Sequence, residues 1–289
     1  MRRPAIAWVA LAGSLAVASP ALAQGHGNAF GHYKSTVSSA SSPTPSSAPQ
    51  GASIAGTGVR NFGSWLDDAS VLTPGEGFVS FGFSLFKTPV YREVDLPSID
   101  SGFAVNRKLQ VGMSVPYSLA NEPGSTVARG FGDVYLSGKY QVRAPSAKRL
   151  GFAVIPLVEV LSVAPPSGSR VQWALPVSVE QQHSGWRLMG TGGYFSRGAL
   201  FGSGAVEFEL SERAWATGSL SHSYSLKSDE LSAALGLTRA RTDVSGGLTW
   251  ALRPDIGIYG SLGRTISSRD NNSASLVAAV GVSFGVTRP

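Results

Sequence analysis

Apolar and polar residues alternate with a period of two from Phe78 to the end of the chain. The clearest stretch is 130–143, GFGDVYLSGKYQVR. Its apolar parity consists of Val134, Leu136, Tyr140 and Val142. Its polar parity includes Asp133, Lys139, Gln141 and Arg143. Since successive side chains of a β-strand point to opposite faces, the stretch predicts a strand with one apolar and one polar face.

Further segments repeat the alternation, and no amphipathic helix is apparent after Gly77. They lie at 79–85, 109–117, 171–180, 200–210, 244–252 and 276–286. Many are longer than the five or six residues usual in globular strands. A tilted strand needs about 9–11 residues to cross a bilayer, so the lengths favour membrane-crossing strands.

The connections between the segments also alternate. Tight turns are predicted at 106–108, 184–185, 211–213 and 253–255, and longer polar loops at 121–128, 165–169, 227–230 and 267–273. Short turns at one end and longer loops at the other are typical of outer-membrane barrels. About 13 segments can be counted, whereas a bacterial barrel needs an even number. We therefore expect about 12 strands, with 98–105 or 231–241 as the segment to exclude.

Prolines at positions 116, 156 and 176 interrupt predicted strands. Proline removes a hydrogen bond from the ladder, so we expect strand ends or bulges near the rim of the barrel.

Composition separates a membrane barrel from a soluble β-sandwich, which the alternation alone would also fit. Charged residues make up only 15% of the chain, against about 25% in soluble proteins. Aromatic residues recur near the ends of apolar faces, as in interfacial girdles; they are Tyr117, Tyr140, Trp186, Tyr194 and Trp250. The predicted fold is all-β: an antiparallel transmembrane β-barrel of about 12 strands with a disordered N-terminal segment.

Four regions are predicted along the chain. Residues 1–23 form a signal peptide, with Arg2 and Arg3, an apolar run, and a small-residue cleavage site at 21–23. Residues 24–60 form a disordered tether rich in Ser and Pro. Residues 61–77 form a lead-in segment, either packed before the first strand or turned once as a helix around Trp65. The barrel occupies 78–287.

The polar parity of the strands should face the barrel lumen. The predicted lumen-lining residues, which are candidates for a pore, are Asp133, Lys139, Gln141, Arg143, Glu159, Gln172, Glu180, Arg187, Glu207 and Glu209. Charges of both signs suit a water-filled pore or a polar network that plugs the barrel. Twelve strands fall between the packed eight-stranded barrel and the open porin of 16–18 strands, so both alternatives stay open.

Other chemistry finds less support in the sequence. The chain has no cysteine, which excludes thiol catalysis and Cys-ligated metal. His26 and His32 could join a metal site, but a solvated polar tail fits them better. His222, in SHSYS, would suit a lipid hydrolase, yet no acidic residue shares its face of the strand. The net charge of +6 is spread along the chain, unlike the clustered stripe of a nucleic-acid binder.

The block 103–142 resembles the MetA-pathway-of-phenol-degradation family of outer-membrane transporters. The similarity rests on Val115-Pro116-Tyr117, on Gly130, Gly132 and Asp133, and on Lys139-Tyr140. It extends more weakly over 76–287. The resemblance implies an outer-membrane barrel linked to uptake of small organic or aromatic compounds. The chain departs from the usual C-terminal aromatic residue, because Phe284 is followed by five further residues.

We therefore expect a non-enzymatic outer-membrane channel, exported by the Sec route, for passive passage of small organic solutes, aromatic or hydrophobic ones included. The alternatives are a structural or binding barrel with a plugged lumen and, more distantly, a lipid-modifying hydrolase. The expected partners are outer-membrane lipid, the solutes and the barrel-assembly machinery. No nucleic acid, cofactor or metal is expected.

Overall fold

The structure is a computed structural model. It describes residues 67–87, 89, 92–119, 130–161, 169–196, 198–226, 238–267 and 273–287. The predicted signal peptide (1–23) and tether (24–60) lie outside these residues. The described residues contain no helix long and apolar enough to cross a membrane.

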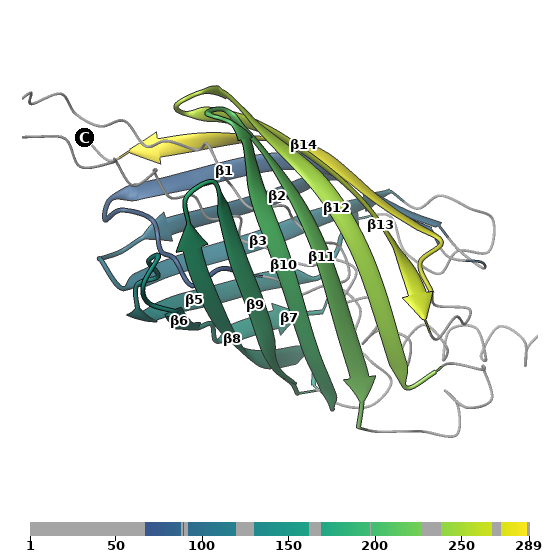
Figure 1. Cartoon of the computed structure of the whole chain (residues 1–289). Helices are drawn as coiled ribbons and strands as arrows, with labels where there is room; N and C mark the ends of the chain where they lie inside the picture. Colours follow the sequence, from purple (N-terminus) through teal and green to yellow (C-terminus); the bar gives the residue numbers. More distant parts are fainter. Residues whose placement is uncertain are drawn as a thin grey trace, which may run out of the picture.

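The chain forms a closed antiparallel β-barrel of 12 strands, which confirms the predicted fold (Figure 1). Ten strands are continuous: β1 (Glu76–Lys87), β2 (Arg92–Ala104), β3 (Leu109–Leu119), β8 (Val171–His183), β9 (Trp186–Phe195), β10 (Ala199–Ser211), β11 (Ala214–Ser225), β12 (Ala240–Arg253), β13 (Ile256–Ser267) and β14 (Leu276–Thr287). Two are interrupted: β4 (Gly130–Phe131) continues as β5 (Val134–Arg143), and β6 (Gly151–Val154) continues as β7 (Leu157–Val160).

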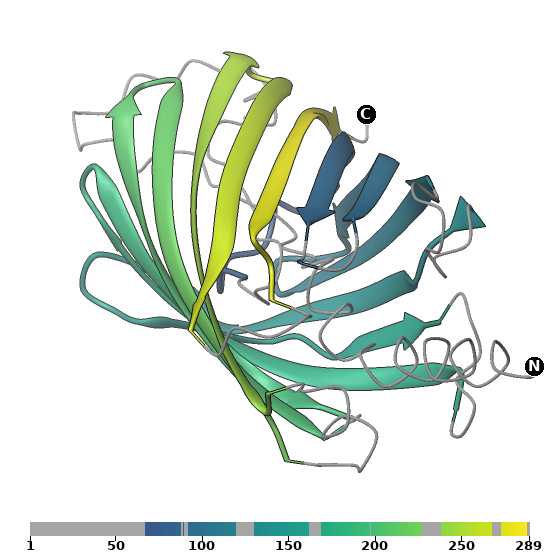
Figure 2. The same ribbon diagram turned by 90° about the vertical axis from the view of Figure 1, so that its right-hand side faces the viewer.

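The first and last strands close the barrel. β1 pairs with β14 in unbroken antiparallel register, from Glu76 opposite Thr287 to Lys87 opposite Leu276. Every other strand pairs with its neighbours in sequence, so the order around the wall follows the chain. Figure 2 looks toward this seam, where the blue first strand lies beside the yellow last strand. Closure leaves the sheet without an open edge. An open edge would expose unpaired backbone N–H and C=O groups to the bilayer, which is energetically costly.

Alternation in the sequence becomes an inner and an outer face. Large apolar side chains of one parity are exposed on the outside, such as Leu262 (63%) and Leu248 (59%). In β5, Tyr140 is 47% exposed, whereas its neighbour Lys139 is 2% exposed. The register predicted for this strand is therefore the observed one; a slip of one residue would have exchanged the two side chains.

The two ends of the barrel differ in their connections. The predicted turns at 106–108, 184–185, 211–213 and 253–255 all join neighbouring strands at one end, the turn end, where β1 also begins; their first residues Ser211 and Arg253 still belong to strands. Gly185 has a φ of 77°, which suits glycine in the two-residue connection between β8 and β9. Most residues of the longer connections at the other end, the loop end, lie outside the described residues.

Prolines shape one part of the wall, and the expectation of strand ends or bulges holds in part. Pro156 lies at the break between β6 and β7, and a register shift in β2 lies beside Pro116. Pro116 and Pro176 themselves lie within β3 and β8, so neither marks a strand end. Each lies across from an interruption in the neighbouring strand: Pro116 faces the gap between β4 and β5, and Pro176 faces the gap at Ile155–Pro156. Since proline has no N–H to donate, the ladder breaks opposite it. An open apolar hollow of about 460 Å³, lined by residues that include Leu136, Pro156 and Trp173, lies on the outer face at the second break.

Two other expectations need correction. Residues 98–104 belong to β2, so excluding 98–105 as a strand is wrong. The second candidate for exclusion, 231–241, lies mostly outside the described residues. Residues 67–70 form no helix, so a helical turn there is not observed; Trp65 lies outside the described residues.

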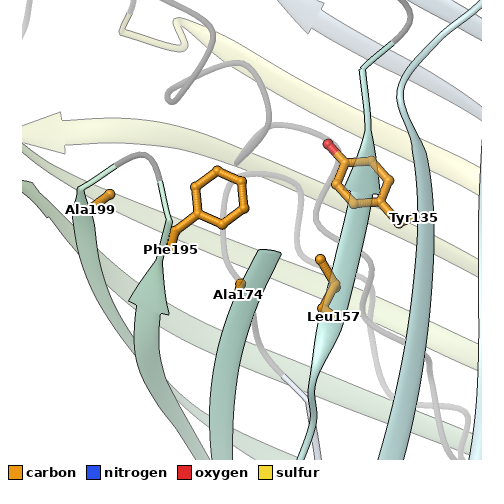
Figure 3. Packing of buried hydrophobic residues seen from close by; sticks show 5 residues of the cluster. All are labelled: Tyr135, Leu157, Ala174, Phe195 and Ala199. Carbon is orange, nitrogen blue, oxygen red and sulfur yellow. The ribbon is translucent and has the colours of Figure 1, made fainter. Parts of the chain in front are cut away.

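Not all of the inner face is polar. Five buried residues on β5, β7, β8, β9 and β10 form an apolar cluster: Tyr135, Leu157, Ala174, Phe195 and Ala199. Figure 3 shows the rings of Tyr135 and Phe195 on opposite sides of Leu157 and Ala174. The cluster shares its parity with Lys139 and Glu159, so it belongs to the inner face.

Candidate functional site: a charged network around the lead-in segment

The described part of the lead-in segment lies against the inner face of the barrel. From Gly75, whose N–H donates to the Ala104 carbonyl at the turn end, the chain runs back to a buried Asp67. The Leu72 N–H donates to Gln110 of β3 (3.1 Å), and the Asp67 N–H donates to Thr191 of β9 (2.9 Å). The segment therefore spans the inside of the barrel between two distant strands.

Lys139 of β5 is the centre of the contacts. Its Nζ lies 2.7 Å from a carboxylate oxygen of Asp67 and 2.7 Å from one of Asp68, and donates to the Ser70 carbonyl at 3.1 Å. All three side chains of this ion cluster are buried. The ammonium thus uses its three donors on the lead-in segment. Buried charges are tolerated when they are paired in this way.

Arg187 of β9 extends the network. Its Nε donates to Glu207 at 2.5 Å, and its Nη1 lies 3.2 Å from Asp68 and 3.8 Å from Glu180. Glu180 of β8 accepts hydrogen bonds from the Ala69 N–H (3.1 Å) and the Ser70 hydroxyl (2.8 Å). Lumen side chains from strands β5, β8 and β9 therefore converge on residues 67–70, and Glu207 of β10 joins the network through Arg187.

The network contains more acidic groups than basic ones. Among the described residues, the carboxylates of Asp67, Asp68, Glu180 and Glu207 form their ion pairs with two cations, Lys139 and Arg187. Asp67 and Asp68 belong to the lead-in segment and not to a membrane-crossing strand. Burial raises the pKa of Asp67 to about 6 and that of Asp68 to about 7, although Lys139 acts in the opposite direction. Protonation of this pair is therefore favoured in the docked state.

The structure brings half of the predicted lumen residues together and leaves the others apart. Lys139, Gln141, Glu180, Arg187 and Glu207 surround the lead-in segment; Gln141 donates to the Ala69 carbonyl at 2.9 Å.

The remaining five lie elsewhere. Glu159 is fully buried on β7, and Asp133 is half-buried in the gap before β5. Gln172 contacts Ser169 and Ser196 near the loop end. Arg143 donates to the Leu150 carbonyl at the turn end, and Glu209 is exposed there. That any of the ten lines an open pore stays a prediction.

Sequence reasoning missed the lead-in partners of these residues. Asp67 and Asp68 were considered only as part of a turn or a packed segment. Two adjacent acids directly before a barrel whose inner face carries Lys139 and Arg187 were the available signal. The pair Arg241 and Asp243 was also missed, because 231–241 was a candidate for exclusion.

No catalytic or metal constellation is found in the described part of the chain. No group of three potential metal ligands occurs there. His222 lies on the outer face beside Leu220, and its Nδ1 lies 2.9 Å from the Thr242 hydroxyl of the neighbouring strand.

Comparison with known proteins supports the fold. No family model matches the sequence, and no curated protein does. Among solved structures, the barrel is similar to the NanC porin, with a TM-score of 0.54 at 12% identity over 72% of this chain and 98% of that one. It is equally similar to the COG4313 outer membrane channel from Pseudomonas putida F1, with a TM-score of 0.54 at 9% identity over 76% and 98%.

A third similar structure is the KdgM porin in complex with disordered oligogalacturonate, with a TM-score of 0.51 at 10% identity over 72% and 98%. At these identities the likeness concerns the fold alone. The barrel shares its fold with these outer-membrane channels and porins. The resemblance to the MetA-pathway family is not confirmed.

Proposed function

We propose that this protein is an outer-membrane channel for passive passage of small organic solutes. The observation that carries the proposal is a closed 12-stranded barrel whose outer face is apolar and whose inner face carries buried polar and charged groups. An apolar exterior fits lipid, and a polar interior fits a water-filled path. The similar solved structures are described as porins and channels, which supports the same role.

The inner face of the barrel carries both apolar and hydroxyl-bearing side chains, which bears on the class of solute. The inner face includes a buried apolar cluster around Tyr135 and Phe195 beside its polar groups. Hydroxyl-bearing side chains dominate the strands across the lumen, among them Ser80, Ser219, Ser261 and Ser283. A lumen with both surfaces favours small amphiphilic or aromatic organic compounds.

A second candidate is a barrel with a plugged lumen, which the docked lead-in segment favours. The segment makes at least five hydrogen bonds or ion pairs to strands β3, β5, β8 and β9. A barrel of this size leaves little room beside such a segment. In this case solutes would bind without crossing, unless the segment undocks.

The remaining expectations belong to the same proposal. An outer-membrane location needs export by the signal peptide, lipid around the apolar face, and the barrel-assembly machinery. Phe284 is exposed on β14 and packs edge-on against Phe81 of β1, with ring centroids 6.3 Å apart. We assign Phe284 the part of the terminal aromatic residue in assembly. A Phe284→Ser variant should accumulate unassembled protein in the periplasm.

Planar-bilayer recording of the purified, refolded protein separates the two candidates. A channel predicts discrete conductance steps and swelling of liposomes in small neutral solutes. A plugged barrel predicts a silent membrane that conducts only in variants that release the lead-in segment. Silence of both the natural chain and such variants, with correctly folded barrels, would contradict the channel.

A further inference from the structure

Arg241 lies on the inner face of β12, one residue from the loop-end start of that strand. Its side chain is only 7% exposed. The guanidinium Nε donates to Asp243 at 2.9 Å, and the other carboxylate oxygen of Asp243 accepts from the Thr265 hydroxyl at 2.6 Å. The Ala274 N–H donates to the same hydroxyl at 2.9 Å. A chain of hydrogen bonds thus holds the guanidinium against the wall.

Arg241 keeps unused donors in this arrangement. Within the part of the chain that the structure describes, neither Nη1 nor Nη2 has a hydrogen-bond partner, although both are buried. Asp243 accepts from the Nε of Arg241 and from the Thr265 hydroxyl, and neither Nη atom donates to it. A buried donor without an acceptor carries a desolvation penalty, which is larger for a charged group. An acceptor oxygen placed at the two Nη atoms would relieve this penalty.

A second unused polar group lies on the same inner face. The Ser203 hydroxyl of β10 is buried and has no hydrogen-bond partner among the described residues. Through the strand register, Ser203 lies opposite Ser221 of β11, which lies opposite Asp243. Strands are about 4.8 Å apart, so Ser203 lies roughly 10 Å from Asp243 across the wall. The guanidinium of Arg241 presents a planar fork of donors, which suits a planar anion.

We propose that Arg241, positioned by Asp243, binds the carboxylate of small organic acids in the lumen. A carboxylate matches the paired Nη donors bidentately, and the charge-assisted bonds exceed those that a neutral amide or water can offer. Since Arg241 lies at the loop end and the charged network lies toward the turn end, a solute entering from the loop end meets the arginine first. A role of Arg241 in the passage of solutes rests on the proposed channel function, whereas the binding of a carboxylate by Arg241 does not.

The test compares two ligands of equal shape, benzoate and benzamide, by titration calorimetry on the full barrel in detergent at pH 7. The variants are Arg241→Gln, Arg241→Lys and, as a matched control, Arg253→Gln. Arg253 is the last residue of the same strand, at an odd-numbered position like Arg241, and is exposed at the turn end. The Arg253→Gln substitution therefore removes the same charge as Arg241→Gln. Heat-modifiable migration in gels checks that each variant is folded.

The natural chain should bind benzoate at least tenfold more tightly than benzamide. Arg241→Gln should lose about tenfold in benzoate affinity, Arg241→Lys should lose less because it keeps the charge without the fork, and Arg253→Gln should match the natural chain. Equal binding of benzoate and benzamide would show that only water occupies the site and would overturn the proposal. An equal loss of benzoate affinity in Arg241→Gln and Arg253→Gln would also overturn the proposal. It would mean that the overall positive charge of the lumen, and not a site at Arg241, attracts benzoate.

Current recordings with added benzoate distinguish the two proposals. Conductance without benzoate binding refutes the anion site and leaves the channel intact. Benzoate binding by a barrel that conducts no current upholds the site and refutes the channel.

Discussion

Two walls of the barrel share one architecture and differ in what covers them. The charged wall, strands β5, β8 and β9, presents Lys139, Glu180 and Arg187, and the lead-in segment lies against it. The serine wall, strands β11 to β14 with β1, presents mainly hydroxyls and small side chains, apart from the Arg241–Asp243 pair near the loop end of β12. On the serine wall, side chains pair with each other across neighbouring strands, as in Ser80 with Ser283 (2.7 Å) and Ser219 with Ser245 (2.8 Å).

The difference shows what decides where an inner segment docks. Short hydroxyls satisfy one another within the sheet and need no further partner. Long charged side chains extend beyond the sheet, and their desolvation is tolerable only with opposite charges and backbone groups around them. The lead-in segment supplies both through Asp67, Asp68 and the Ser70 carbonyl. The charged wall is thus the docking surface, and the serine wall is the surface left to line the lumen.

The largest expected effect comes from neutralising the charged wall at Lys139. In Lys139→Met the two aspartates lose their buried cation, which typically costs about 3–5 kcal/mol. Docking of the lead-in segment should weaken at least a hundredfold, and single-channel conductance should rise severalfold. Lys108→Met removes an exposed lysine from the turn between β2 and β3 and serves as the control. Equal conductance in both variants would mean that the segment does not restrict the lumen.

A smaller effect is expected from pH. Because burial raises the pKa of Asp67 and of Asp68, the docked segment binds protons more readily than the free one. Docking of the lead-in segment is therefore strengthened below the raised pKa values and weakened as pH rises through them. The charged groups of the network around the two aspartates are Lys139, Glu180, Arg187 and Glu207. Conductance should be higher at pH 8 than at pH 5. The Asp67→Asn, Asp68→Asn double variant should lose this difference; a pH response that survives in it would place the titrating group elsewhere.

The smallest effect is expected from replacing one glycine in each wall by alanine. A Cβ at Gly281 of β14 would lie 2.5 Å from the ring of Tyr259 and 2.7 Å from the Phe81 carbonyl, whereas a Cβ at Gly138 of β5 meets nothing within 4 Å. Overpacking of this kind costs about 1–3 kcal/mol. Gly281→Ala should lower the temperature of heat-modified gel migration by about 5 °C. Gly138→Ala should leave that temperature unchanged or raise it slightly, and an equal drop in both would remove the contrast.

The sequence by itself determined the strands, their faces and the closed barrel. Period-two alternation fixes which side chains meet lipid, because a one-residue slip would bury Lys139 in the bilayer. It therefore predicted the inward Lys139 and the outward Tyr140. The same local logic identified most turns, where charge and glycine interrupt the apolar pattern.

Only the tertiary structure decided what the inner face contacts. Asp67 and Asp68 precede the first strand by several residues, and alternation says nothing about an irregular segment. Their meeting with Lys139, more than 70 positions later, depends on closure of the barrel and on the path of the chain inside it. The breaks opposite Pro116 and Pro176 have the same origin, since a missing N–H acts on whichever strand lies alongside. Strand pairing and barrel closure bring together residues that are far apart in the sequence. The charged network and the breaks in the wall depend on these contacts, so local sequence patterns do not predict them.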